Sequence, residues 1–153
     1  MISSRAFFLL LLLTPFLSAC RSTAPAPRTA EVIYQGSAEP STLTVRSVGY
    51  GETAGEAVQH AEESAFWTLL FRGIPGSPQA NALVPSGETN EHAPYFDELL
   101  TGGRYATFMT ESYLESEPEK TGRTRRAVVS LTINANALRR DLEQHGVIRK
   151  FGF

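Results

Sequence analysis

The most informative single residue is Cys20, the only cysteine in the chain of 153 residues. An apolar run precedes it, and a segment rich in proline and small residues follows it. A disulfide within the chain is excluded because there is no second cysteine, and the segment after Cys20 has almost no apolar side chains to bury. The Cys20 thiol is therefore not expected to form a disulfide or to lie in a core.

Residues 1–19 have the composition of an export signal. Arg5 supplies a positive charge, the run AFFLLLLLTPFL is apolar, and small residues stand directly before Cys20. A membrane-spanning helix needs about 20 apolar residues, whereas this run is shorter and is interrupted by Pro15. We therefore expect residues 1–19 to be a signal peptide that is removed.

The four residues Leu17, Ser18, Ala19 and Cys20 resemble the lipobox of bacterial lipoproteins. This resemblance implies that Cys20 receives a thioether-linked diacylglycerol, becomes the new N-terminus and is acylated there, with palmitate as the expected acyl chain. Several acyl chains make such an anchor effectively permanent. Arg21 follows, where inner-membrane lipoproteins of the best-studied sorting system carry aspartate, so the resemblance implies the periplasmic face of the outer membrane.

Other residues that could do chemistry lack the required spacing. His60, His92 and His145 are not spaced as metal ligands, and QHAEE has no second histidine to complete H-E-x-x-H. No serine lies in G-x-S-x-G. We therefore expect no catalytic residues, no metal and no cofactor, and a lipid-anchored hydrolase is the least favoured function.

The glycine-rich stretch GYGETAG superficially resembles a phosphate-binding loop, because it follows an expected strand and precedes an expected helix. It lacks the G-x-G-x-x-G pattern and a Lys-Ser/Thr ending, and Glu52 and Glu56 would repel phosphate. A tight turn between strand and helix explains it better. After removal of residues 1–19 the chain keeps 13 basic and 16 acidic residues, a formal net charge of −3, which argues against a nucleic-acid partner.

The composition after Cys20, rich in proline and small residues, predicts a flexible tether over residues 20–40. The hydrophobic periodicity of the remaining chain predicts one domain over residues 41–153. A strand is expected over 41–51. The helix after it should be capped by Thr53 and Glu56 and stopped by Gly73 and Pro75.

Beyond this helix we expect a long loop over 72–94, a short helix over 95–100, and two paired strands over 105–115 and 125–134. A last helix is expected with Asn136 as its cap and Gly146 after its end, and VIRKF could add an edge strand. The predicted fold class is α+β, in the order β-α-α-β-β-α, with helices packed on one face of a small antiparallel sheet.

Two segments of this domain resemble a known family. They are VRSVGYGETAGEAVQHAEESAFWTLL, over 45–70, and AVVSLTINANALRRDLEQHGV, over 127–147. Both are similar to segments of the 20-kDa lipoprotein family and of the N-terminal domain of the flagellar assembly protein T. The resemblance implies a small α+β envelope domain that acts through protein contacts, with no catalytic residues to carry over.

The end of the first helix, FWTLLF, is apolar on more than one face, so part of it could be exposed for a partner. The candidate contact residues are Trp67, Phe71, Ile74 and Pro75; alternatively, these aromatics are simply core. We expect a non-enzymatic interaction or assembly component of the cell envelope, held in the outer membrane by its lipid and docking an envelope protein. The alternative is a module that binds a small ligand or peptidoglycan in a cleft under loop 72–94.

Overall fold

The computed structural model describes residues 31–150. Five strands form one antiparallel sheet in the order β1-β2-β5-β3, with β4 paired to β5. The strands are β1 (Val32–Gly36), β2 (Thr42–Gly51), β3 (Met109–Leu114), β4 (Glu119–Thr121) and β5 (Thr124–Asn134). The helices are α1 (Ala54–Phe71), α2 (Glu88–Glu91), α3 (Ala93–Leu99), the 3-10 helix η1 (Arg104–Phe108) and α4 (Ala135–Gln144).

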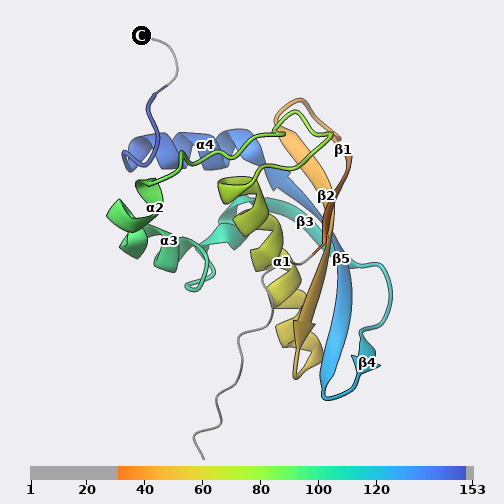
Figure 1. Cartoon of the computed structure of the whole chain (residues 1–153). Helices are drawn as coiled ribbons and strands as arrows, with labels where there is room; N and C mark the ends of the chain where they lie inside the picture. The colour runs from red at the N-terminus through yellow and green to blue at the C-terminus, as the bar shows by residue number, and fades with distance from the viewer. Residues whose placement is uncertain (1–30, 151–153) are drawn as a thin grey trace, which may run out of the picture.

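The helices lie together on one side of the sheet, which confirms the predicted fold class (Figure 1). The predicted signal peptide and the lipidated Cys20 fall outside the described residues. Among residues 31–150, no helix is both long enough and apolar enough to span a bilayer.

Strands β2 and β5 form the centre of the sheet and alternate between its two faces. Leu43 pairs with Ile133 and Val45 pairs with Leu131, and all four side chains are buried in the core on the α1 face. On the other face, Thr44 and Thr132 share a hydrogen bond of 3.0 Å. The predicted strands over 41–51 and 125–134 are therefore confirmed within a residue at each end.

Helix α1 begins as predicted and packs very closely on β2. The Thr53 hydroxyl accepts the Glu56 N–H, and the Glu56 carboxylate accepts backbone N–H groups in return, which completes the capping box. Ala57 and Ala61 face the sheet and are fully buried. They lie opposite Gly49, which leaves no room for a β-carbon between strand and helix.

The prediction of a tether over 20–40 is wrong for its last part. Residues 32–36 form β1, an edge strand paired with β2. Val32 and Tyr34 pack against the core on one face, while Ile33 lies on the other. The ordered domain therefore begins before residue 41, because a short alternating segment can bury one face once β2 is there to pair with it.

The predicted strand over 105–115 is wrong in its first half, because residues 104–108 form η1 and β3 begins at Met109. Gly103 has a left-handed backbone, with φ of 75°, at the start of η1. Tyr105 and Phe108, three residues apart, can then turn inward together. Between β3 and β5, residues 119–121 form the short strand β4, which pairs with the start of β5.

Two expectations near the end of the chain need correction. The cap of α4 is Asn134 rather than Asn136, and its Oδ1 accepts the Ala137 N–H at 2.9 Å. Residues 147–150 form no strand. Instead Val147 donates its N–H to the Leu142 carbonyl at 2.9 Å, which makes a Schellman-type ending at Gly146, where the helix is predicted to stop, and holds the segment against α4.

Loop 72–94 is attached to the end of α1 by backbone hydrogen bonds. The last carbonyl groups of a helix have no partner within it. The Leu69 and Leu70 carbonyls accept the N–H groups of Leu83 (3.4 Å) and Val84 (2.9 Å), and both loop side chains are buried. The predicted loop also contains α2, and the predicted short helix begins at Ala93 rather than Tyr95.

Candidate functional site: the Trp67 groove

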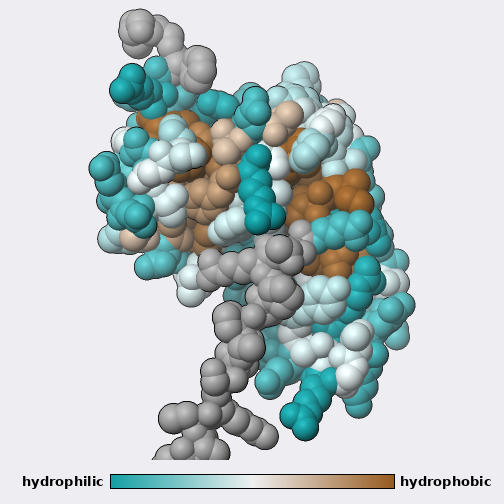
Figure 2. Space-filling view, viewed as in Figure 1, coloured by the Kyte–Doolittle hydropathy of each residue, from teal (hydrophilic) through white to brown (hydrophobic). Residues whose placement is uncertain are grey.

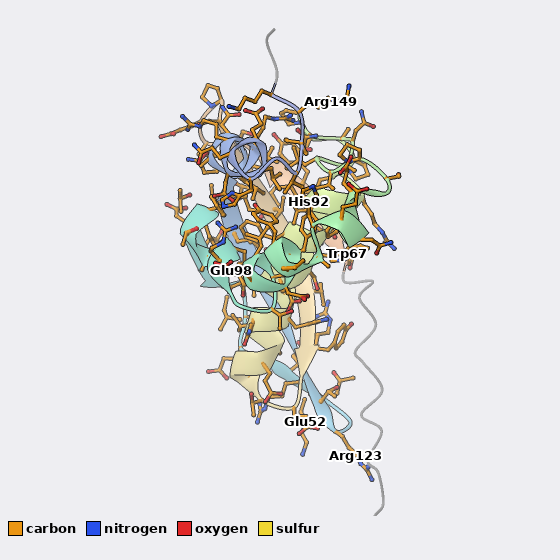
Figure 3. All side chains as sticks on the ribbon, turned by 90° about the vertical axis from the view of Figure 1, so that its left-hand side faces the viewer. Glu52, Trp67, His92, Glu98, Arg123 and Arg149 are labelled. Atoms are coloured by element: carbon orange, nitrogen blue, oxygen red, sulfur yellow. The ribbon has the colours of Figure 1, made fainter. Side chains whose placement is uncertain are left out.

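The outward face of α1 carries a stripe of side chains at steps of three and four residues. His60, Glu63, Trp67 and Phe71 follow this spacing, which places them along one side of the helix. The stripe runs beside α2 and α3, and Figure 3 shows Trp67 next to this pair of short helices on the helical side of the molecule. The surface is thus built by α1 on one side and by α2 and α3 on the other.

Between α1 and α2–α3 lies a shallow cleft of about 190 Å³, which we name the Trp67 groove. It is lined by Glu63, Trp67, Phe71, Thr89, Asn90, Ala93, Phe96, Asp97, Leu100 and Thr101.

A chain of aromatic contacts forms the floor of the groove. The ring centroids of Trp67 and Phe71 are 5.6 Å apart, and those of Phe71 and Phe96 are 5.0 Å apart, edge to face. The Arg72 guanidinium lies 4.9 Å from the Trp67 ring centroid. Phe96 is buried, whereas Trp67 and Phe71 are half-buried, so the floor is both fixed in position and open to a partner.

The rim of the groove is polar and carries negative charge. Glu63 and Asp97 stand on opposite walls, one from α1 and one from α3, and Thr89, Asn90 and Thr101 supply hydroxyl and amide groups. An apolar floor beside carboxylates can receive an apolar side chain that is flanked by lysine or arginine. The groove therefore has the chemistry of a contact surface for a protein segment.

The structure brings together two of the four predicted contact residues. Trp67 and Phe71 both line the groove. Pro75 is exposed, but it lies outside the groove lining.

The prediction for Ile74 is wrong, because its side chain is fully buried in the core, with 0% exposure. Its N–H donates to the Gln79 carbonyl at 2.9 Å, so the chain turns back at this point and folds Ile74 inward.

Sequence reasoning missed the second wall of the groove. Phe96 and Asp97 come from the predicted short helix, but nothing local shows that this helix returns to the end of α1. The available signal was that the pair Tyr95–Phe96 and the end of the first helix, residues 66–71, are both rich in aromatic side chains. Such residues attract one another across a fold, although their spacing in the sequence does not reveal it.

A cluster centred on Asp141 fixes α3 in place. The Tyr95 hydroxyl donates to Asp141 Oδ2 at 2.6 Å, and Arg104 Nη1 lies 3.1 Å from both carboxylate oxygens. Burial, together with the bond to Asp141, raises the pKa of Tyr95 well above its ordinary value. Burial alone would lower the pKa of Arg104, but its bonds to Asp141 and Tyr95 raise it instead.

A second polar cluster joins α1 to η1 and β3. Ser112 Oγ donates to Glu62 at 2.6 Å, and the Tyr105 hydroxyl lies 3.5 Å from the other oxygen of the same carboxylate. Burial, followed by the charges of Glu62 and Glu63, raises the pKa of Tyr105 to about 12. Tyr105 therefore stays neutral at physiological pH and serves as a donor to Glu62.

The three histidines have separate surroundings. His60 Nδ1 lies 3.1 Å from the Tyr50 backbone N–H, and His145 Nδ1 lies 2.8 Å from the Asp141 carbonyl oxygen. His92 Nε2 is 3.6 Å from the Glu88 carboxylate. With Glu91 these two residues place three possible metal-ligand atoms within 4.8 Å of one another, as expected for residues at positions i, i+3 and i+4 along α2.

Comparison of the chain with models of known protein families, with curated proteins and with solved structures found no match. The resemblances to bacterial lipoproteins, to the 20-kDa lipoprotein family and to the flagellar assembly protein T domain therefore stay predictions.

Proposed function

We propose that this chain is a lipoprotein of the bacterial cell envelope. Its lipidated Cys20 anchors it to the periplasmic face of the outer membrane, and its domain acts without catalysis as an interaction or assembly component. The Trp67 groove is the observation that supports this function best, because half-buried aromatic side chains surrounded by a polar rim are typical of the centre of protein interfaces.

The chemistry of the groove also favours one kind of partner. A protein segment that offers an apolar side chain would contact Trp67 and Phe71. Lysine or arginine beside that side chain would meet Glu63 and Asp97. Because the two carboxylates are near solvent, they would affect the association rate and its salt dependence more than the final affinity.

The first experiment tests the anchor. Mass spectrometry of the N-terminal peptide of the protein purified from its own membranes should give an acylated Cys20, and Cys20→Ser should release the protein from the membrane. An unmodified Cys20 that is still attached to residues 1–19 would contradict the proposal.

The second experiment tests the groove. A photo-crosslinking amino acid at Asn90, which is exposed and lines the groove, should capture one envelope protein in intact cells. The same group at Lys120, exposed on the β4 strand, should not capture it. Asp97→Lys should reduce the yield of the crosslinked complex from position 90 severalfold, because it places a positive charge on the rim where the partner's lysine or arginine would lie.

Glu91→Lys is the matched control for Asp97→Lys. It makes the same change of charge on an exposed position of α2 that does not line the groove, so the crosslink should persist. Equal losses in both variants, or equal capture from positions 90 and 120, would count against the groove as the contact surface.

A second candidate function is the binding of a small ligand or of peptidoglycan under loop 72–94. One observation favours it. A cleft of about 560 Å³ lies where residues 83–88 of this loop meet the end of α4, and its volume is typical of ligand sites.

A further inference from the structure

The Trp67 groove lies close to the point where the described residues begin. The Glu31 carbonyl accepts the Val48 N–H at 3.1 Å. Beside Val48, Ser47 Oγ donates to the Ala61 carbonyl of α1 at 2.7 Å. Neighbouring strands are about 4.8 Å apart, and Trp67 follows Ala61 by six residues, about 9 Å along the helix. Glu31 is therefore within roughly 20 Å of the groove.

The sequence immediately before Glu31 combines proline with arginine. It reads RSTAPAPRTA over residues 21–30, which lie outside the described part of the chain. It contains no acidic side chain, and Arg21 and Arg28 give it a formal charge of +2. A proline-rich segment in an extended conformation spans about 3.1 Å per residue, so the six steps from Pro25 to Glu31 can cover about 19 Å. This length is comparable to the distance that separates Glu31 from the groove.

The Trp67 groove is complementary to such a segment in charge. The described residues of its lining include two carboxylates, Glu63 and Asp97, and no lysine or arginine. Arg72 packs on the Trp67 ring, with its guanidinium 4.9 Å from the ring centroid, but it does not belong to this lining. A basic segment would therefore meet uncompensated negative charge at the rim of the groove.

The groove is also complementary to proline. Its floor carries the half-buried rings of Trp67 and Phe71. Figure 2 shows apolar side chains, in brown, among polar ones on the side of the molecule where α2 and α3 lie. Proline-rich segments bind aromatic-lined grooves well because their extended conformation is already formed, so that little conformational entropy is lost on binding.

We propose that residues 24–28 of this chain bind the Trp67 groove, with Pro25 and Pro27 on the aromatic floor and the Arg28 guanidinium at the carboxylate rim. This contact rests on the proposed function in one respect, that the groove is a contact surface. A short linker gives an effective concentration on the order of millimolar, so even a weak contact would be formed within the chain. A protein partner must then displace residues 24–28 before it can occupy the groove.

The first test maps the contact directly. It uses the chain from residue 20 onward with Cys20→Ser, which retains residues 21–30 and every described element. A photo-crosslinking amino acid in place of Ala26 should form a crosslink within one chain to residues 63–71 or 89–101, identified by mass spectrometry of the digested monomer. Arg28→Glu should lower the yield of this crosslink about fivefold, because it replaces an attraction at the rim by a repulsion. Arg21→Glu is the matched control, since it makes the same change of charge outside residues 24–28.

The second test uses Trp67 as the reporter, because it is the only tryptophan of the chain. Replacing both prolines, by Pro25→Gly with Pro27→Gly, should raise the acrylamide quenching constant of Trp67 and shift its emission to longer wavelength. Ser22→Gly with Thr23→Gly adds two glycines to the same segment and keeps the prolines, so it should change neither quantity.

Three results would overturn the contact. They are an Ala26 crosslink that maps elsewhere or joins two chains, equal effects of Arg21→Glu and Arg28→Glu, and a Trp67 signal that is unchanged when both prolines are replaced. The proposed function is tested separately, because Arg28→Glu should raise the capture of an envelope protein from position 90. Capture that occurs without any effect of residues 24–28 would refute the contact and leave the proposed function standing.

Discussion

The close contact between α1 and β2 makes Gly49→Ala the most informative test of the fold. A β-carbon at position 49 would overlap the Ala57 carbonyl oxygen and the backbone nitrogen of Ala61, and it would lie 2.8 Å from the Ala61 Cα. All three are backbone atoms in the interior of an 18-residue helix. No side-chain rotation can relieve the overlap, so α1 must move away from the sheet.

The cost follows from how far the helix must move. Ordinary van der Waals contact begins near 3.4 Å, so relief requires a retreat of roughly 1 Å, and a gap of that size forfeits up to half of each contact energy. The retreat would loosen Ala57, Ala61 and Ala65, which are now fully buried against the core. We expect Gly49→Ala to lower the free energy of unfolding by about 3 kcal/mol or more.

The measurement is urea unfolding followed by circular dichroism, with Gly55→Ala as the matched control. Gly55 lies in the first turn of α1, and a β-carbon there meets nothing within 4 Å. Alanine should therefore raise the free energy of unfolding at this position by about 0.5–1 kcal/mol. If Gly49→Ala changed stability by less than about 0.5 kcal/mol, the helix would not lie as close to β2 as the alanines imply.

Two further predictions concern the polar clusters that hold the helices. Asp141→Asn should lower the free energy of unfolding by about 2 kcal/mol, because it weakens the acceptor shared by Tyr95 and Arg104, and urea unfolding measures the loss. The pKa of Tyr105 is about 12 in the folded chain, against 10.0 for an ordinary tyrosine. As the pH rises above 10, the Tyr105 hydroxyl therefore loses its proton in the unfolded chain before it does so in the folded chain. Stability should therefore fall between pH 10 and 12. The free energy of unfolding of the Tyr105→Phe variant should fall less steeply with pH in that window. Equal slopes for the variant and the original chain would show that Tyr105 does not titrate as described.

Local signals in the sequence predicted the parts of the fold that depend on neighbouring residues. The capping box at Thr53 and the stop after α1 are both within a few residues of the features that cause them. Strand β5 was recognisable from its alternation over 125–134. Such elements are fixed by propensity and spacing, which a single sequence displays directly.

The errors at β1 and at Ile74 share one physical cause, which is contact with a distant segment. Strand β1 is ordered because β2 is available to pair with it, and Ile74 is buried because loop 72–94 returns to the end of α1. The same return brings Phe96 against Phe71 to complete the Trp67 groove. Half of the groove, Trp67 and Phe71, could therefore be predicted from the sequence, whereas the wall from α2 and α3 could not.

The short helix α2 stands between the two clefts and contributes to both. Glu88 lines the cleft of about 560 Å³ at the end of α4, while Thr89 and Asn90 line the Trp67 groove. Removing residues 88–91 would therefore alter both surfaces at once and could not assign a function to either. Point variants on the outer walls, Asp97 for the groove and Arg149 for the cleft, change one lining each. If Asp97→Lys abolished capture of a partner and Arg149→Gln left it unchanged, the groove and not the cleft would be the contact surface, despite the wall that they share.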